Sequence, residues 1–315
     1  MDSRRNSDRL VSIAKGFLAV VVALCAALLM AHIRTSSAQQ PTAPAPSAPG
    51  AVQVQVQSGN APVQAQGRGR GGRGGGFHEP SPLNFDDHTG YTQIFDGTDL
   101  KGWDGDPAVW HVEDGAIVGI STPEHPAHSF ISYKDLTAKD LDLKFEIKVE
   151  QGGGSGIQYR SKTGPWLNRP QNNPNNPTPS NGNWLMSGPQ ADFWFPVRPQ
   201  SEQFTGQFYT ENNALGIIAW RGEVVEMGPG EPPQLEGNIQ DRRALGGYVK
   251  TNDWNQYEVI ARGGTFIHLI NGQLMALLVD DDASDVNNQS GLIGIEIESA
   301  PCKVSVRNIW VKKFN

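Results

Sequence analysis

Glu146, Gln158 and Arg160 lie in two stretches, residues 141–149 and 157–160, in which apolar and polar side chains alternate. A two-residue period is that of a β-strand, because successive side chains point to opposite faces. A run of glycines joins the two stretches. The pattern therefore predicts an antiparallel hairpin with a carboxylate, an amide and a guanidinium together on its polar face.

A second pair of carboxylates, Glu296 and Glu298, shares one strand face near the C-terminus by the same period. With Glu146 they could supply a general base and a general acid, while Arg160 and Gln158 could hold a developing oxyanion. Paired carboxylates also suit ordinary glycoside hydrolysis. The alternative is that these charges form the solvated face of each strand.

Two long segments without a strand pattern, residues 162–187 and 196–211, are rich in aromatic side chains. Loops of this length in a compact β fold commonly line a site. Their aromatic rings could stack on sugar C–H faces or form a small core beneath the loop. The predicted substrate-binding residues in and between these loops are Trp166, Trp184, Gln190, Asp192, Trp194 and Tyr209.

Short β-rich segments separated by Gly, Asn and Asp recur from residue 91 to the C-terminus. Turn signals such as Asp96-Gly97 and Asn271-Gly272 separate them. No stretch keeps the 3.6-residue period of an amphipathic helix. The sequence therefore predicts an all-β fold, an antiparallel β-sandwich with jelly-roll connections.

The N-terminal region has the pattern of an export signal. Basic residues precede an apolar run at residues 16–31, and Ser36-Ser37-Ala38 offers small residues for cleavage. We expect a signal peptide at 1–38, a disordered Pro/Ala/Gln and Arg-Gly-rich tether at 39–83, and the folded domain at 84–315. The protein is expected in the periplasm, cell envelope or medium, touching a membrane only through an uncleaved signal.

The formal net charge is −7, which divides into about +5 on residues 1–80 and about −12 on the remainder. An acidic folded domain repels the phosphate backbone, so we expect no nucleic-acid partner. Cys302 remains alone after signal cleavage, so no disulfide is expected. A divalent metal held by Glu146, Asp192 or Glu298 stays open. The spacing of His125 and His128 is a weaker metal signal, because Pro126 disfavours a helix that would align them.

Eight short motifs in the region 90–313 occur in the order and spacing of one known family. They are Phe95-Asp96-Gly97-Thr98-Asp99-Leu100-Lys101-Gly102-Trp103, Trp110-His111-Val112-Glu113-Asp114-Gly115, Leu141 to Glu146, Ser155 to Arg160, Gln190-Ala191-Asp192, Trp254-Asn255, Asn271-Gly272 and Arg307-Asn308-Ile309. In these the chain resembles the 3-keto-disaccharide hydrolase domain family, which implies a concanavalin A-like sandwich. The family usually has Gln and His in its penultimate strand, where this chain reads Gly294-Ile295-Glu296-Ile297-Glu298, and often Glu at the position of Gln190.

The resemblance implies a carbohydrate substrate and hydrolysis of 3-keto-glycosides. A keto group at C3 acidifies the hydrogen at C2, so a base can remove it while the glycosidic oxygen at C1 leaves; water then adds. The rival interpretation is a non-catalytic glycan-binding module of the same fold, and a weaker one is a scaffold domain in an envelope complex.

Overall fold

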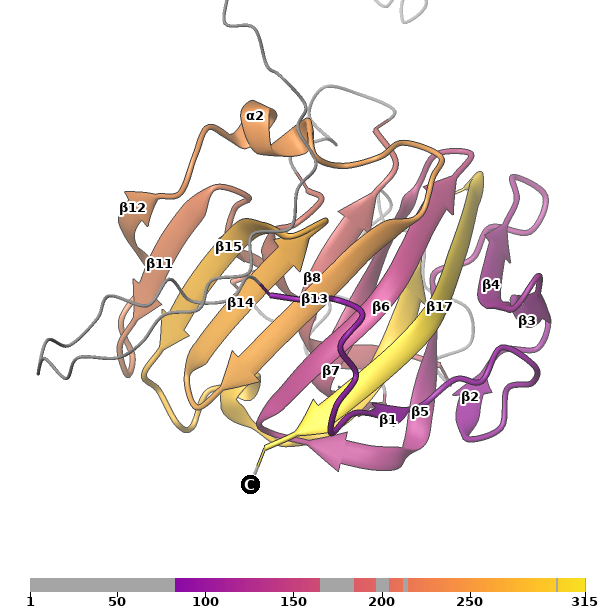
Figure 1. The fold of residues 1–315 in the computed structure, drawn as a ribbon, viewed down its shortest axis with the longest axis horizontal. Coiled ribbons are helices and arrows are strands. Elements are labelled where there is room, and N and C mark those ends of the chain that lie inside the picture. The colour runs from indigo at the N-terminus through magenta and orange to yellow at the C-terminus, as the bar shows by residue number, and fades with distance from the viewer. Residues whose placement is uncertain (1–82, 165–183, 197–203, 212–214, 299, 315) are drawn as a thin grey trace, which may run out of the picture. The chain divides into compact units, whose positions relative to one another are not determined.

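In the computed structural model of the chain, residues 83–164, 184–196, 204–211, 215–298 and 300–314 are described, and they form two β-sheets packed face to face (Figure 1). Nearly all pairings are antiparallel; β11 and β15 pair in parallel. The predicted all-β antiparallel sandwich of the jelly-roll, concanavalin A-like type is confirmed.

The larger sheet has ten strands among the described residues, in the order β12-β11-β15-β14-β13-β6-β17-β4-β3, with β1 beside β17. The strands are β1 (Thr92–Gln93), β3 (Trp110–Glu113), β4 (Ala116–Ser121), β6 (Leu141–Glu150), β11 (Glu223–Met227), β12 (Gln234–Asn238), β13 (Asn255–Arg262), β14 (Thr265–Ile270), β15 (Gln273–Asp280) and β17 (Cys302–Lys313).

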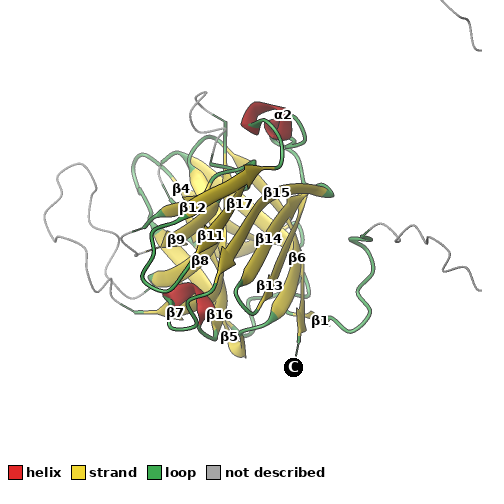
Figure 2. Ribbon diagram, turned by 90° about the vertical axis from the view of Figure 1, so that its left-hand side faces the viewer, coloured by secondary structure: helices red, strands yellow, loops and turns green. Residues whose placement is uncertain are grey.

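The smaller sheet has seven strands in the described parts of the chain, in the order β10-β9-β8-β7-β16-β5-β2. They are β2 (Trp103–Gly105), β5 (Ser129–Ala138), β7 (Gly154–Thr163), β8 (Met186–Trp194), β9 (Phe208–Glu211), β10 (Ile217–Ala219) and β16 (Gly291–Ile297). Two short helical elements, α2 (Arg242–Gly246) and the 3-10 turn η2 (Val286–Asn288), complete the described secondary structure; α2 lies at one end of the sandwich (Figure 2). In the described part of the chain, no helix has the length and apolar character needed to cross a bilayer.

The hydrophobic core lies between the two sheets, where the apolar positions of alternating strands meet. In β6, Leu141, Leu143, Phe145 and Ile147 are fully buried, as the two-residue period predicts. Burial of such side chains stabilises the fold by about 1.5–3 kcal/mol each. The alternation thus fixes which face of each strand is turned to the core.

The predicted hairpin between residues 141–149 and 157–160 is wrong. β6 pairs with β13 and β17 in the larger sheet, whereas β7 pairs with β8 and β16 in the smaller one. The glycine run between them carries the chain from one sheet to the other. Gly152 and Gly153 have φ of 94° and 71°, which favours glycine, so the run serves as a crossover.

The polar face of β6 is also drier than expected, because the N-terminal segment 83–91 crosses the outer face of the larger sheet (Figure 1). Lys144 is 4% exposed and donates from Nζ to the backbone oxygens of Asn84 and Asp87 at 2.9 and 3.0 Å. Its ammonium also lies 4.7 Å from the ring centroid of Tyr91. The segment therefore belongs to the folded domain.

The prediction that residues 196–211 form a loop is wrong for its last four residues, because Phe208–Glu211 form the strand β9. β8 was not predicted as a strand either. Its register places Gln190 opposite Gln158 of β7 on one side and Tyr209 of β9 on the other. This arrangement brings polar residues of three strands together on the smaller sheet.

Candidate functional site

A cavity of about 220 Å³ opens on the outer face of the smaller sheet. β8, β9 and β16 position its walls, because every second side chain of each strand points away from the core. The residues that line it are Gln190, Asp192, Trp194, Phe204, Gln207, Tyr209, Glu211, Ile217, Glu296 and Glu298. Six predicted site residues therefore come together here, and we call this cavity the acidic pocket.

Gln190 links the carboxylates of the acidic pocket. Its Nε2 donates to Oδ1 of Asp192 and to Oε2 of Glu296, both at 2.7 Å. Its Oε1 accepts from Gln158, whose own oxygen accepts from Ser161 at 2.6 Å. All five residues are at most 3% exposed. Gln158 thus lies behind the pocket and positions Gln190 rather than lining the cavity.

Glycines on the neighbouring strand β7 make room for this arrangement. A Cβ atom at position 156 would lie 2.5 Å from side-chain atoms of Gln190, and one at position 154 would lie 2.5 Å from the Trp194 ring. Both distances are shorter than van der Waals contact permits. The glycines of the crossover therefore let Gln190 and Trp194 lie flat against the sheet.

Asp192 is one of the deeply buried carboxyl groups of the pocket, 3% exposed. Burial, followed by the charges of Glu296 and Glu298, raises the pKa of Asp192 well above its usual range; the hydrogen bonds from Gln190 and Gln207 oppose this shift without cancelling it. Asp192 is therefore poised to hold a proton at pH values where an exposed aspartate has lost it.

Gln207 connects Asp192 to a polar network in the core. Its Nε2 donates to Oδ2 of Asp192 at 2.5 Å, and its backbone oxygen lies 3.1 Å from Nδ1 of His268. The other ring nitrogen of His268 lies 2.8 Å from the Tyr159 hydroxyl. Burial lowers the pKa of His268 to about 3, so this imidazole stays neutral, donates from Nδ1 and accepts from Tyr159.

The Oε1 atom of Gln207 is buried without a hydrogen-bond partner among the described residues. Rotation of the amide by 180° would present this oxygen to Asp192, and a protonated carboxyl could then donate to it.

His128 approaches the two glutamates from the start of β5. Its Nε2 lies 2.9 Å from Oε1 of Glu296 and 3.9 Å from Oε2 of Glu298. The pairing of Ser129 with Ile297 sets this contact, because it places the preceding residue opposite Glu298. Ligand atoms of the three side chains lie within 4.8 Å of one another. One imidazole and two carboxylates form a donor set that fits a divalent first-row metal ion.

A row of half-buried aromatic rings leads away from the acidic pocket. Trp194 and Phe204 have ring centroids 5.2 Å apart, and Phe204 stacks on Trp220 at 5.9 Å. The guanidinium of Arg242 lies 4.4 Å from the Trp220 ring. Tyr209 stands on the pocket wall, where burial raises its hydroxyl pKa and keeps the group neutral. Such rings can stack on sugar C–H faces.

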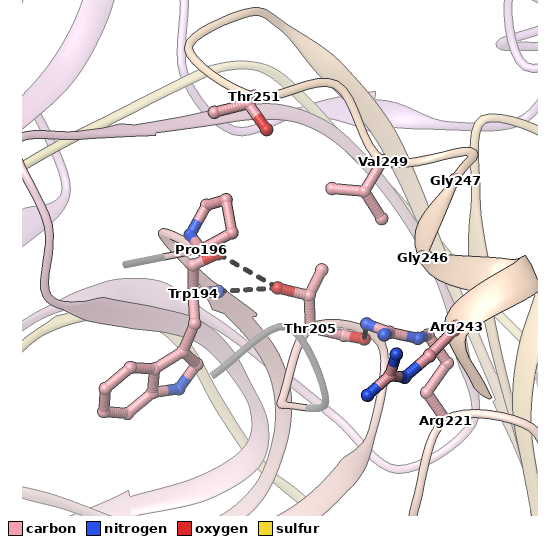
Figure 3. Close-up of a pocket in the computed structure, with 9 residues that line it drawn as sticks. All are labelled: Trp194, Pro196, Thr205, Arg221, Arg243, Gly246, Gly247, Val249 and Thr251. Atoms are coloured by element: carbon pink, nitrogen blue, oxygen red, sulfur yellow. Dashed lines mark hydrogen bonds between the residues drawn. The ribbon is translucent and has the colours of Figure 1, made fainter. Parts of the chain in front are cut away.

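A second cavity, of about 270 Å³, lies beyond Trp194 (Figure 3). The hydroxyl of Thr205 bonds to both the backbone nitrogen and the backbone oxygen of Trp194, at 2.9 and 3.1 Å, and so fixes the shared wall. Arg221 and Arg243 reach the same side of this cavity, beside Thr205 (Figure 3). We call it the arginine pocket.

Glu146 does not reach the acidic pocket, because β6 belongs to the opposite sheet. Its Oε2 accepts from Arg307 at 2.8 Å and from Asn308 at 2.6 Å. The Arg307 guanidinium also lies 4.0 Å from the ring centroid of Trp254. The prediction that Glu146 and Arg160 face one hollow is therefore wrong.

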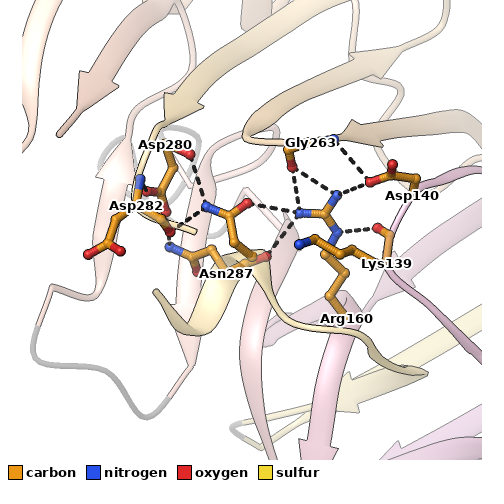
Figure 4. A network of polar contacts seen from close by, with 8 residues as sticks. Lys139, Asp140, Arg160, Gly263, Asp280, Asp282 and Asn287 are labelled. Atoms are coloured by element: carbon orange, nitrogen blue, oxygen red, sulfur yellow. Dashed lines mark hydrogen bonds and ion pairs between the residues drawn. The ribbon is translucent and has the colours of Figure 1, made fainter. Parts of the chain in front are cut away.

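Arg160 is buried in a network of backbone oxygens (Figure 4). Its guanidinium donates to the oxygens of Lys139, Gly263 and Asn287, and pairs with Asp140 at 3.1 Å. The residue has φ of 52°, at an irregularity in the pairing of β7. This break in the strand turns the side chain into the network, where it holds three loops together.

Trp184 lies outside the acidic pocket as well. Its Nε1 donates to Oδ1 of Asp104 at 3.3 Å, next to the edge strand β2. Trp166 lies outside the described residues. Of the predicted tryptophans, Trp194 is the one whose place on the pocket wall is described.

The sequence signature of the 3-keto-alpha-glucoside-1,2-lyase-like domain matches residues 90–312, and the chain belongs to this family. No curated protein matches the chain in sequence.

Several solved structures have folds similar to that of this chain, at low sequence identity. A Parabacteroides distasonis protein, provisionally named a glycosyl hydrolase, is 19% identical over 72% of this chain and 95% of its own, with a TM-score of 0.42. A Bacillus subtilis protein of unknown function with a galectin-like fold is 14% identical over 71% of this chain and 94% of its own, with a TM-score of 0.43. The carbohydrate-binding module CBM66 of Bacillus subtilis is 14% identical over 67% of this chain and 96% of its own, with a TM-score of 0.39. Identities this low say nothing about activity.

Proposed function

We propose that this protein cleaves 3-keto-glycosides in the acidic pocket, by removal of the proton next to the keto group. The observation that carries the proposal is the convergence of Asp192, Glu296 and Glu298 on one cavity, where burial raises the pKa of Asp192 above that of an exposed carboxyl group. Two carboxyl groups with separated pKa values can serve as acid and base in the same site. Membership of the 3-keto-alpha-glucoside-1,2-lyase-like family supports the same chemistry.

The roles follow from exposure. Glu298, with a side chain 26% exposed at the rim, takes the C2 proton as the C–H bond breaks. The electrons form the C1–C2 double bond, and the C1–O bond breaks. Asp192 donates its proton to the departing oxygen. Water adds to the double bond in the hydrolytic outcome, whereas the unsaturated sugar is released in the lyase outcome.

His128, Glu296 and Glu298 offer a second role, as ligands of a divalent metal ion. A bound ion would polarise the C3 keto oxygen and so acidify the C2 hydrogen. In that case the two glutamates would serve as ligands, and the carboxylate form of Asp192 would take the C2 proton and return it to the departing oxygen.

Incubation of the purified protein with 3-keto-lactose or 3-keto-trehalose, with and without EDTA, tests the proposal. We expect release of the second sugar. Loss of turnover with EDTA and its recovery with added Mn²⁺ or Zn²⁺ would assign the glutamates to a metal, whereas unchanged turnover would assign Glu298 to the base. Absence of turnover on both sugars under all of these conditions would contradict the enzyme proposal.

A glycan-binding module is the second candidate, favoured by the aromatic row of Trp194, Phe204 and Trp220. It would bind neutral oligosaccharides without turning over any keto-sugar. Trp194→Ala would then weaken glycan binding, which equilibrium titration measures directly.

We further propose that the protein is exported, with cleavage after Ala38. The basic, apolar and small-residue pattern of residues 1–38 supports this. Mass spectrometry of the mature protein should find Gln39 at the N-terminus, and an intact N-terminal segment would indicate a membrane anchor instead.

A further inference from the structure

The arginine pocket differs in charge from the acidic pocket beside it. The residues that line it are Trp194, Pro196, Thr205, Arg221, Arg243, Gly246, Gly247, Val249 and Thr251, so its described lining contains two arginines and no carboxylate. The described lining of the acidic pocket contains the carboxylates of Asp192, Glu211, Glu296 and Glu298 and no arginine or lysine. A ligand that spans both would meet opposite charges at its two ends.

The buried arginine of the pocket is fixed in place. Arg221 is 2% exposed, and it donates from Nη1 to the Thr205 oxygen at 2.7 Å and from Nε to the Arg242 oxygen at 2.9 Å. Gly246 allows its close approach, since a Cβ there would lie 2.9 Å from Nη2. A guanidinium already held by the backbone loses little side-chain entropy when an anion binds.

The second arginine stands at the cavity mouth. Arg243 is exposed, in the last turn of α2. Its neighbour Arg242 pairs with Glu223 at 3.0 Å, whereas no carboxylate among the described residues forms an ion pair with Arg243. Its positive charge is therefore available to a ligand in the cavity.

The two pockets are close enough to serve one molecule, because the same residue, Trp194, lines both. Each alone is small for a ligand site, but cavities of about 270 and 220 Å³ together reach the range of such sites, about 300–1,000 Å³. A sugar chain that leaves the acidic pocket over Trp194 would enter the arginine pocket next.

We propose that the arginine pocket is a second sugar subsite, which takes the carboxylate of a uronic-acid residue in an extended glycoside. A planar carboxylate matches the fork of a guanidinium and can be bound by two parallel hydrogen bonds. The inference rests on the proposed function, since the acidic pocket would hold the 3-keto sugar of the same glycoside. The substrate class is therefore an acidic 3-keto-oligosaccharide.

The test compares two disaccharides, one of glucose with glucuronate and one of two glucoses, in equilibrium titrations with the wild-type protein, Arg243→Gln and Arg262→Gln. Arg262 is an exposed arginine that stacks on Phe314 and lines neither pocket. The wild-type protein and Arg262→Gln should both bind the acidic disaccharide about tenfold more tightly than the neutral one. A factor of this size is the effect of one charge-assisted hydrogen bond. Arg243→Gln should lose that preference. The preference should also fall at high ionic strength, because the arginine is exposed.

Equal binding of the two sugars by wild type, or a preference that survives in Arg243→Gln, overturns the subsite. The 3-keto forms of the same disaccharides separate this result from failure of the proposed function. A binding preference with no turnover of either keto-sugar keeps the subsite and contradicts the enzyme. Turnover of both at equal kcat/KM, with equal binding, keeps the enzyme and contradicts the subsite.

Discussion

Three kinds of interaction act on the pKa of Asp192: burial, neighbouring charges and hydrogen bonds. Burial and the neighbouring Glu296 and Glu298 raise the pKa of Asp192, while amide donors from Gln190 and Gln207 partly stabilise its charge. A carboxyl group in this position holds its proton to higher pH than an exposed aspartate does, as suits a general acid. The proposed chemistry therefore depends on the environment of this one side chain.

Replacement of Asp192 by Asn should change how stability depends on pH. The folded pKa lies above the unfolded value of about 3.9, so the folded protein binds this proton more tightly than the unfolded chain does. The contribution of Asp192 is present below the unfolded pKa and is lost as the pH rises through the folded pKa. Asp192→Asn removes this loss, and its amide can donate to Oε1 of a rotated Gln207.

The free energy of unfolding of Asp192→Asn should thus gain on that of the wild type as the pH rises above about 4, the pKa of an aspartate in the unfolded chain. Urea titrations at several pH values measure the difference. Parallel pH profiles for the two proteins would show that the buried carboxyl group is not protonated in the fold.

At the scale of elements, the acidic pocket depends on one crossover. The chain leaves β6 in the larger sheet, turns at Gly152 and Gly153, and enters β7, whose glycines lie under Gln190 and Trp194. The same segment thus connects the sheets and provides the floor of the site.

Gly156→Ala tests this floor. The new Cβ would lie 2.5 Å from Gln190, so Gln190 must move and its bonds to Asp192 and Glu296 must weaken. We expect a loss of about 1–3 kcal/mol in unfolding free energy and a lower kcat in the protein that remains folded. Gly237→Ala is the matched control, because nothing lies within 4 Å of its added Cβ. Full activity of Gly156→Ala would contradict the role of Gln190.

The contacts of Arg160 give it a structural role, because its guanidinium is held by buried backbone oxygens and by Asp140. Arg160→Met keeps most of the packing but leaves the buried oxygens of Lys139, Gly263 and Asn287 without this donor. We expect a loss of about 3–5 kcal/mol in unfolding free energy. The kcat of the folded fraction, corrected for its population by circular dichroism, should stay at the wild-type value. A fully stable but inactive variant would return Arg160 to the site.

Much of this level of organisation was predictable from the sequence. The two-residue period identified β6, β7 and β16 and the face of each strand, because alternation determines which side chains can be buried. It could not tell to which sheet a strand belongs, since that depends on pairing with distant segments, so Glu146 was placed at the wrong site.

Other parts of the site left a weaker signal. β8 begins with polar and turn-forming residues that include Gly188 and Pro189, and its alternation is clear only from Gln190 to Trp194. His128 lies 168 residues from Glu296, and only the pairing of β5 with β16 brings them into contact. The imidazole pair with His125 was visible in the sequence, but its partner was not.

At the scale of the whole molecule, the N-terminal segment 83–91 is part of the sandwich. It covers Lys144, Asp142 and Glu258, and burial, followed by the charge of Asp142, raises the pKa of Glu258 to about 7. We propose that residues 84–315 form the independent folding unit and that residues 39–83 are a tether.

Two truncations separate these regions. A chain that begins at residue 83 should keep the Tm of the full-length protein within about 2 °C, whereas a chain that begins at Tyr91 should lose several degrees. The second truncation removes Asn84 and Asp87, whose oxygens accept from buried Lys144. Leaving that ammonium without these partners costs about 1–3 kcal/mol, or about 2–12 °C. Equal Tm values for the two chains would place the domain boundary after this segment.

The rate of sugar release from 3-keto-trehalose by Asp192→Asn and Glu146→Gln, compared with the wild type, tests the location of the chemistry most directly. The two substitutions change the same chemical group on opposite sheets. We predict that Glu146→Gln keeps wild-type kcat/KM, while Asp192→Asn loses at least about 100-fold. An active Asp192→Asn beside an inactive Glu146→Gln would contradict the assignment of the reaction to the smaller sheet.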